Sequence, residues 1–147
     1  RDSVASRGLG DVYKRQVHLH GSLFDFRCTD CDEPYTAEIA LPHEPVPTIT
    51  PPTCPTCSGL IRPGVVWFGE ALPEAEWHEA ERRMRTADAL LIVGTSGVVY
   101  PAAGLPLMAH AREIPIIEVT PMRTDLSHLA TVVVEDTAAN ALPKLLG

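Results

Sequence analysis

All four cysteines of the chain lie in two Cys-x-x-C pairs, and this spacing most strongly constrains the fold. Cys28/Cys31 and Cys54/Cys57 are separated by 22 residues that include several prolines and threonines and show no helical periodicity. Each pair places two thiols on one tight turn, and two such turns packed together supply four sulfur ligands for a tetrahedral zinc ion. Four thiolates fill the coordination sphere, so the sequence predicts a closed, structural zinc module over residues 28–62.

Two alternatives for the cysteines remain open at this point. A pair of disulfides is typical of secreted chains, and nothing in the sequence marks this chain as secreted. A thioredoxin-like redox pair needs one Cys-x-x-C and leaves the second pair unexplained.

The composition favours one soluble domain with at most a small appended module. The chain has 147 residues, of which 45% are hydrophobic, and a formal net charge of −7. This acidic balance disfavours nucleic acid and membrane surfaces as partners, and the basic residues among 82–85 are expected on a solvated helix face. No apolar stretch reaches the roughly 18 residues that span a bilayer, and no signal-peptide core is present, so we expect a cytoplasmic location.

The first 16 residues look foreign to the rest of the chain. Ser6 to Gln16, SRGLGDVYKRQ, resembles the translation of a transposase adapter used to prepare sequencing libraries. We therefore leave residues 1–16 out of the fold prediction and expect the natural gene to be truncated upstream of about Val17. The alternative is an ordinary flexible tail.

After the second cysteine pair, short apolar runs alternate with helical patterns. Strands are expected at 65–68, 89–93, 114–119 and 131–134, and helices at 73–86, 101–112 and 137–146. Near-continuous apolar strands separated by helices favour a parallel sheet with helices on its faces. The predicted fold class is α/β: a partial Rossmann-like parallel sheet, formed by residues 17–27 and 63–147, with the four-cysteine zinc-ribbon module inserted at 28–62.

Small polar residues follow the predicted strands, where ligands of parallel sheets bind. Gly94, Thr95 and Ser96 follow one strand, Thr120 the next, and residues 135–138 the last. Gly94 permits close backbone approach, and the neighbouring hydroxyls and amides are suited to a phosphate or a ribose. An ordinary turn is the open alternative, since such residues are common in βα loops and no G-x-G-x-x-G motif is present.

Several short motifs follow one another in a characteristic order. They are His20-Gly21-Ser22, the two Cys-x-x-C pairs, Arg62-Pro63, VVWFGE at 65–70, Gly94-Thr95-Ser96 and VVYPAA at 98–103. Together they resemble the sirtuins, the NAD-dependent protein deacylases, over residues 17–147. The WFGE and VYPAA forms are similar to the bacterial and mitochondrial branch that includes desuccinylases. The family's first strand, its Gly-Ala-Gly phosphate loop and its Gln-Asn-Ile-Asp segment have no counterpart before Val17.

The resemblance implies that His20 is a general base. In the family, the acyl-lysine oxygen attacks the nicotinamide ribose of NAD, nicotinamide leaves, and the histidine takes a proton from a ribose hydroxyl. The products are free lysine, nicotinamide and an O-acyl-ADP-ribose. An imidazole exchanges protons near neutral pH, which suits this task. From the residues alone, a core histidine beside a glycine turn is the competing interpretation. The other five histidines carry no predicted role. Four of them are expected to be solvated, namely His43, His78, His110 and His128, and the fifth is His18.

The resemblance also implies a site for acylated-lysine peptides or proteins and a site for NAD. An extended segment with free backbone groups can add a peptide as a strand, although a plain core strand is the alternative. Val66 and Phe68 line the acyl-lysine tunnel in this interpretation, Gly69 and Glu70 bond the peptide backbone, and Val99 and Tyr100 face them. The implied NAD residues are Gly94, Thr95, Ser96, Thr120 and Ala138. Thr120 stands where relatives have an asparagine, so altered NAD affinity is expected.

Two other functions remain open at this stage. One is a non-catalytic zinc-ribbon scaffold or partner-binding module, and the other is an NAD-dependent ADP-ribosyltransferase. The Gly-Ala-Gly phosphate loop and the asparagine of the Gln-Asn-Ile-Asp segment are missing before Val17. We therefore expect these 147 residues alone to be inactive as a deacylase.

Overall fold

The computed structural model describes residues 15–40 and 42–146, and the chain divides into two compact units, Arg1–Glu74 and Ala75–Gly147. The segment interpreted as foreign, 1–16, lies almost entirely outside the described residues. The division differs from the predicted one, which joined 17–27 and 63–74 to the α/β part. In the structure these residues group with the cysteines, because the strands on either side of the cysteine module pair with each other.

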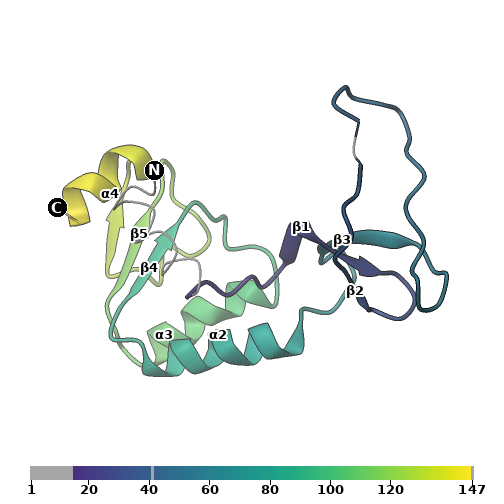
Figure 1. The fold of residues 1–147 in the computed structure, drawn as a ribbon. Helices are drawn as coiled ribbons and strands as arrows, with labels where there is room; N and C mark the ends of the chain where they lie inside the picture. Colours follow the sequence, from purple (N-terminus) through teal and green to yellow (C-terminus); the bar gives the residue numbers. More distant parts are fainter. Residues whose placement is uncertain (1–14, 41, 147) are drawn as a thin grey trace, which may run out of the picture. The chain divides into compact units, whose positions relative to one another are not determined.

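The first unit is built on a small antiparallel sheet with the strand order β2-β1-β3 (Figure 1). Its strands are β1 (Gly21–Cys28), β2 (Pro34–Tyr35) and β3 (Ile61–Val65). The register pairs Gly21 with Val65 and Cys28 with Ile61, with an irregularity between Ser22 and Phe26. The pairing brings the residue just after His20 to the end of β3, and it places the first cysteine pair beside the start of that strand.

The prediction of a strand at 65–68 is wrong, because β3 covers Ile61–Val65 and ends where the expected strand begins. The chain then turns, and the backbone N–H of Glu70 donates a hydrogen bond to the carbonyl of Trp67 at 3.0 Å. Gly69 adopts a φ of 89°, a left-handed conformation that interrupts an extended strand. Residues 66–70 therefore form an exposed connection and not part of the sheet core.

The second unit confirms the predicted parallel sheet, with the order β4-β5-β6. Its elements are α2 (Glu74–Thr86), β4 (Leu90–Val93), the 3-10 turn η1 (Ala102–Gly104), α3 (Leu105–Ala111), β5 (Ile116–Val119), β6 (Val132–Val134) and α4 (Ala138–Leu146). The expected strands and helices of this unit are present with slightly later starts, except that the helix expected at 101–112 is divided in two. Among the described residues no helix has the length and apolar character to span a bilayer.

The helix expected at 101–112 is split into η1 and α3, and Pro106 supplies the physical reason. Proline has no backbone N–H, so it cannot donate to Ala102 and extend an α-helical ladder through this point. Instead Gly104 donates to the carbonyl of Pro101 at 2.8 Å, a three-residue spacing. Pro106 is then tolerated in the first turn of α3, where an N–H has no helical partner anyway.

Helices α2 and α3 both contribute side chains to the core against the sheet. The buried cluster consists of Ile92, Ala109, Ile116, Leu126 and Leu129, with Met84 packed against it. Arg112, just after α3, donates from Nη1 to the carbonyls of Met84 at 2.7 Å and Ala87 at 2.8 Å. A cation at these carbonyls satisfies acceptors that the end of α2 leaves unpaired.

Candidate functional site

The four cysteine sulfurs form a compact cluster in the first unit, and all four cysteines are free. Their Sγ atoms lie within 4.8 Å of one another, with Sγ–Sγ distances of 3.4 Å for Cys28–Cys57, 3.7 Å for Cys31–Cys54 and 3.4 Å for Cys31–Cys57. A tetrahedral ion with Zn–S bonds of about 2.3 Å requires sulfurs about 3.8 Å apart. The cluster therefore fits a zinc ion, and the separations exceed the roughly 2.05 Å of a disulfide.

Backbone N–H groups and the crowding of the sulfurs both shift the pKa values of cysteine thiols in this cluster. Hydrogen bonds from the backbone of Cys57 and Thr56 lower the pKa of the Cys54 thiol to about 7. At Cys31 the backbone of Glu33 acts in the same direction, yet neighbouring sulfurs, Cys57 foremost, and burial raise the pKa to about 12. Four sulfurs this close cannot all become thiolates without a cation between them, and a divalent metal supplies that charge.

His20 lies in an exposed turn and not in the core. The turn is closed by the backbone N–H of Gly21, which donates to the carbonyl of His18 at 3.0 Å. The His20 side chain is exposed, and its imidazole has no hydrogen-bond partner among the described residues. The His20 side chain is therefore not part of the core of the first unit, and its role as a general base stays a prediction. The predicted solvation of the other histidines is confirmed, since His43, His78, His110 and His128 are all exposed.

The segment predicted to bind peptide is tied to the same turn. The backbone N–H of Val66 donates to the carbonyl of His20 at 3.0 Å. Phe68 projects into solvent with 99% of its surface exposed, and neither Phe68 nor Gly69 makes a hydrogen bond within the described part of the chain. Their backbone groups are therefore available to a partner, and peptide binding at this segment stays a prediction.

Glu70 differs from this expectation, because its N–H and its carboxylate are already used within the turn. The carboxylate pairs with the Arg62 guanidinium and accepts a hydrogen bond from the Trp67 backbone N–H at 2.9 Å. The hydrogen bond from Arg62, together with the one from Trp67, lowers the pKa of Glu70 to about 2. Arg62 is the residue whose role the sequence interpretation missed, although its Arg-Pro motif was noticed.

The polar residues after the parallel strands meet at one edge of the second unit. Val93, Val119 and Val134 are the last residues of β4, β5 and β6 and are paired in register, so the residues that follow them are neighbours. Gly94 has a φ of 64°, and a Cβ built there would meet nothing within 4 Å. Thr95 and Ser96 are exposed. Open space beside a glycine and two exposed hydroxyls fits a phosphate or ribose.

Thr120 lies at this edge, and its hydroxyl proton is already used within the protein. The residue is 6% exposed, and its Oγ1 donates to the carbonyl of Met122 at 2.6 Å. The hydroxyl thus stabilises the loop after β5 as a donor, and the expected contact of Thr120 with a ribose stays a prediction. Ala138, the first residue of α4, is half-buried.

Glu118 is a buried carboxylate beside this edge that the sequence interpretation did not single out. It is 1% exposed and accepts hydrogen bonds from the hydroxyls of Thr124 and Ser127. The hydroxyl of Ser127 also accepts from the Thr124 backbone N–H at 2.8 Å. These bonds hold the loop between β5 and β6. The available signal was an acidic residue inside an otherwise apolar strand.

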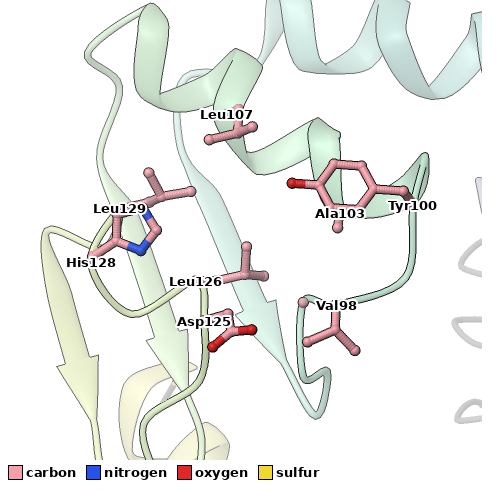
Figure 2. A pocket seen from close by; sticks show the side chains of 9 residues that line it. Val98, Tyr100, Ala103, Leu107, Asp125, Leu126, His128 and Leu129 are labelled. Atoms are coloured by element: carbon pink, nitrogen blue, oxygen red, sulfur yellow. The ribbon is translucent and has the colours of Figure 1, made fainter.

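A cavity of about 310 Å³ adjoins the VVYPAA segment in the second unit (Figure 2). It is lined by Gly97, Val98, Tyr100, Ala103, Leu107, Asp125, Leu126, His128 and Leu129. Tyr100 is therefore at a cavity, whereas Val99 does not line it. The predicted facing of Val99 and Tyr100 toward Val66 and Phe68 joins residues of two units and stays a prediction.

Comparisons with known proteins agree with these features. The Sir2 family model matches residues 8–101. The chain is 59% identical to NAD-dependent protein deacylase 2 of Corynebacterium efficiens, over 97% of this chain and 58% of that protein. The crystal structure of a Sir2 homolog–NAD complex aligns with a TM-score of 0.77 and 41% identity, covering 88% of this chain and 48% of that one. Sir2Tm bound to a propionylated peptide aligns with a TM-score of 0.71 and 27% identity, covering 88% and 54%.

The chain thus spans 58% of the length of the curated relative and about half of each solved structure. The match to the family model covers well over half of the 147 residues, and it contains the His20 turn, all four clustered cysteines and the β4 edge. The chain belongs to the Sir2 family.

Proposed function

We propose that the chain is part of an NAD-dependent protein-lysine deacylase, which converts acyl-lysine and NAD into free lysine, nicotinamide and O-acyl-ADP-ribose. The observation that carries the proposal is the His20 turn. An exposed imidazole without a protein partner lies beside a segment, Val66–Gly69, whose backbone groups at Phe68 and Gly69 are free. This geometry supports the proposal, since an imidazole can accept a proton and free backbone groups can bond a peptide.

His20 is the proton acceptor in this proposal. NAD, when bound, supplies the ribose carbon that the acyl-lysine oxygen attacks and the nicotinamide that leaves. The imidazole of His20 takes a proton from a ribose hydroxyl and becomes a cation. Its exposure allows the proton to pass to solvent afterwards, which returns the imidazole to its neutral form.

The edge after β4 is the proposed contact for NAD. Gly94 leaves room for close approach of a phosphate, and the exposed Thr95 and Ser96 supply hydroxyl and amide donors. Ala138 stays in the proposal as the small residue against adenine. Support comes from the similar Sir2 homolog solved as an NAD complex.

The proposed partners are proteins or peptides that carry an acylated lysine, bound along Val66–Gly69. Phe68 lines the acyl chain in this proposal. Acetyl- and succinyl-lysine are both to be assayed, because the WFGE and VYPAA forms resemble the branch that includes desuccinylases.

The zinc ion is proposed as a structural element. Cys28, Cys31, Cys54 and Cys57 would hold it, and a sphere of four thiolates leaves no position for water or substrate. Cysteines that bind zinc instead of forming disulfides are typical of a reducing compartment, and on that ground we propose a cytoplasmic location.

The test uses the protein expressed from the natural gene, because this chain spans only 58% of the length of its curated relative. Purified protein is incubated with NAD and a peptide that contains one acetyl- or succinyl-lysine, and nicotinamide is measured. We expect release that depends on the acyl group, with O-acyl-ADP-ribose as co-product, and no detectable release by these 147 residues alone.

The other functions give different outcomes in the same assay. Release with transfer of ADP-ribose to protein and without deacylation indicates an ADP-ribosyltransferase. No release from the complete product, with zinc bound, indicates a non-catalytic scaffold and contradicts the proposal.

A further inference from the structure

We propose that Arg62 and Glu70 are a positioning pair that holds the turn Trp67–Glu70 in the conformation that receives an acyl-lysine peptide. This inference rests on the proposed function, because the turn belongs to the segment assigned to the peptide. It assigns the Glu70 side chain to the protein itself and not to the substrate.

Arg62 reaches three parts of the segment from its place in β3. Its Nη2 donates to the carbonyl of Val65 at 2.7 Å and to Oε2 of Glu70 at 3.0 Å, while Nη1 pairs with the other carboxylate oxygen. Its Cζ lies 5.7 Å from the centre of the Trp67 ring, within the range of a cation–π contact. The guanidinium thus connects the end of the strand with both ends of the turn.

Glu70 completes the connection from the other end. Its Oε2 accepts the Trp67 backbone N–H at 2.9 Å, and its own backbone N–H donates to the Trp67 carbonyl at 3.0 Å. Two hydrogen bonds therefore close the turn between the same two residues, and the carboxylate is aligned by the planar fork of Arg62. The lowered pKa of Glu70, about 2, keeps it ionised at neutral pH.

The closed turn leaves Phe68 and Gly69 as its unbonded tip. Phe68 is 99% exposed, and neither residue makes a hydrogen bond in the described part of the chain. Isolated surface ion pairs contribute little to stability. This pair differs because the Arg62 and Glu70 side chains are only 19% and 34% exposed and because both bond the backbone. Its effect is preorganisation: a turn already in the binding conformation loses less entropy when a peptide docks.

The experiment compares Glu70→Ala and Glu70→Gln with the unmodified 147-residue chain, all loaded with zinc. Amide hydrogen exchange is followed by NMR at Trp67, and binding of a fluorescein-labelled peptide with one acetyl-lysine is followed by anisotropy. Glu79→Ala is the matched control, since Glu79 also pairs with arginines but lies on α2. Zinc content and the amides of β1 report whether the module is folded.

In Glu70→Ala we expect the Trp67 amide to exchange at least about tenfold faster and the peptide to bind about tenfold more weakly, as for loss of a hydrogen bond to a charged group. Glu70→Gln should show the same changes to a smaller extent. If the alanine variant loses zinc and is therefore unfolded, the glutamine variant is the one that tests the proposal. Glu79→Ala should change neither quantity.

Unchanged amide exchange at Trp67 in both variants overturns the proposal that Arg62 and Glu70 hold the turn. So does faster exchange with unchanged peptide affinity, since the turn would then not matter for binding. If the unmodified chain binds no peptide, the proposed peptide site of this chain fails, and the pair is judged on Trp67 exchange alone.

Discussion

The carbonyl of His20 accepts a hydrogen bond from the backbone N–H of Val66 at 3.0 Å, and the neighbouring residues Gly21 and Val65 are paired in the sheet. The proposed base and the first residue of the proposed peptide segment are thus joined by the backbone of one small antiparallel sheet. Their separation is set by the pairing of β1 with β3. Substitutions of the side chains should therefore change chemistry or binding without moving this backbone frame.

Replacing His20 by alanine should abolish most turnover of the complete gene product. Loss of a general base typically costs about 10²–10⁴-fold in rate. The exposed side chain packs against little, so folding and zinc content should be retained. Nicotinamide release is the measurement, and His43→Ala, another exposed histidine in the same unit, is the control. Undiminished turnover in His20→Ala would refute the role of general base.

Zinc should bind with one ion per chain, and its removal should unfold the region around residues 28–61. The buried residues Cys28, Cys54 and Ile61 form the small core there, so the energy of metal binding is also folding energy. Metal content by mass spectrometry and amide exchange with and without a chelator test this prediction. Amides of the second unit, for example in β5, serve as the internal control. A chelated chain that keeps the protection of β1 and β3 contradicts it.

Gly97→Ala should destabilise the second unit. Gly97 has a φ of 72°, and an added Cβ would lie 2.2 Å from Cγ of the buried Leu126. Overpacking and backbone strain together predict a loss of about 1–3 kcal/mol in the free energy of unfolding, measured in urea. Gly104→Ala is the matched control, because its φ is −76° and a Cβ there meets nothing within 4 Å. Equal stabilities of the two variants would exclude this explanation of Gly97.

Glu118→Ala should loosen the loop between β5 and β6. The substitution leaves the hydroxyls of Thr124 and Ser127 without their acceptor. It also opens a cavity in the interior, because Glu118 is only 1% exposed. We expect a loss of about 2–4 kcal/mol in the free energy of unfolding. Glu135→Ala, which removes an exposed pair with Arg123, should change it by less than about 0.5 kcal/mol. A small effect of Glu118→Ala would show that the loop is held by other contacts.

The stability of the second unit should fall in acid partly through Glu79. Hydrogen bonds from Arg82 and Arg83 lower the pKa of Glu79 from 4.5 to about 2. Because the folded carboxylate holds its proton less tightly than the unfolded one, this contribution is complete above about pH 4.5 and is lost as the pH falls toward 2. Urea unfolding at pH 6 and pH 3, followed by the circular dichroism of the helices, which belong to the second unit, measures it. Glu79→Gln should show a smaller difference between the two pH values, and an identical difference would contradict the assignment.

The repeating patterns of the second unit were sufficient to predict its strands, its helices and the parallel sheet. Apolar β-branched runs and helical periodicity are local properties, and parallel strands place their carboxyl ends on one edge wherever they pair. Gly94 and Thr120 could therefore be located at that edge in advance. That the hydroxyl of Thr120 donates to the carbonyl of Met122 depends on the conformation of the following loop.

The sequence by itself determined the four-cysteine cluster, the α/β class and the family resemblance, because each depends on residue types at short, regular spacings. The tertiary structure decided which residues share a unit and which polar groups are already engaged. The pairing of β1 with β3 groups residues 21–28 with the cysteines, and it brings His20 to Val66 across more than forty residues of chain. The carboxylates of Glu70 and Glu118 likewise acquire their partners only through folding. Hydrogen bonds and ion pairs of this kind depend on atoms meeting in space, and residue spacing along the chain does not specify those meetings.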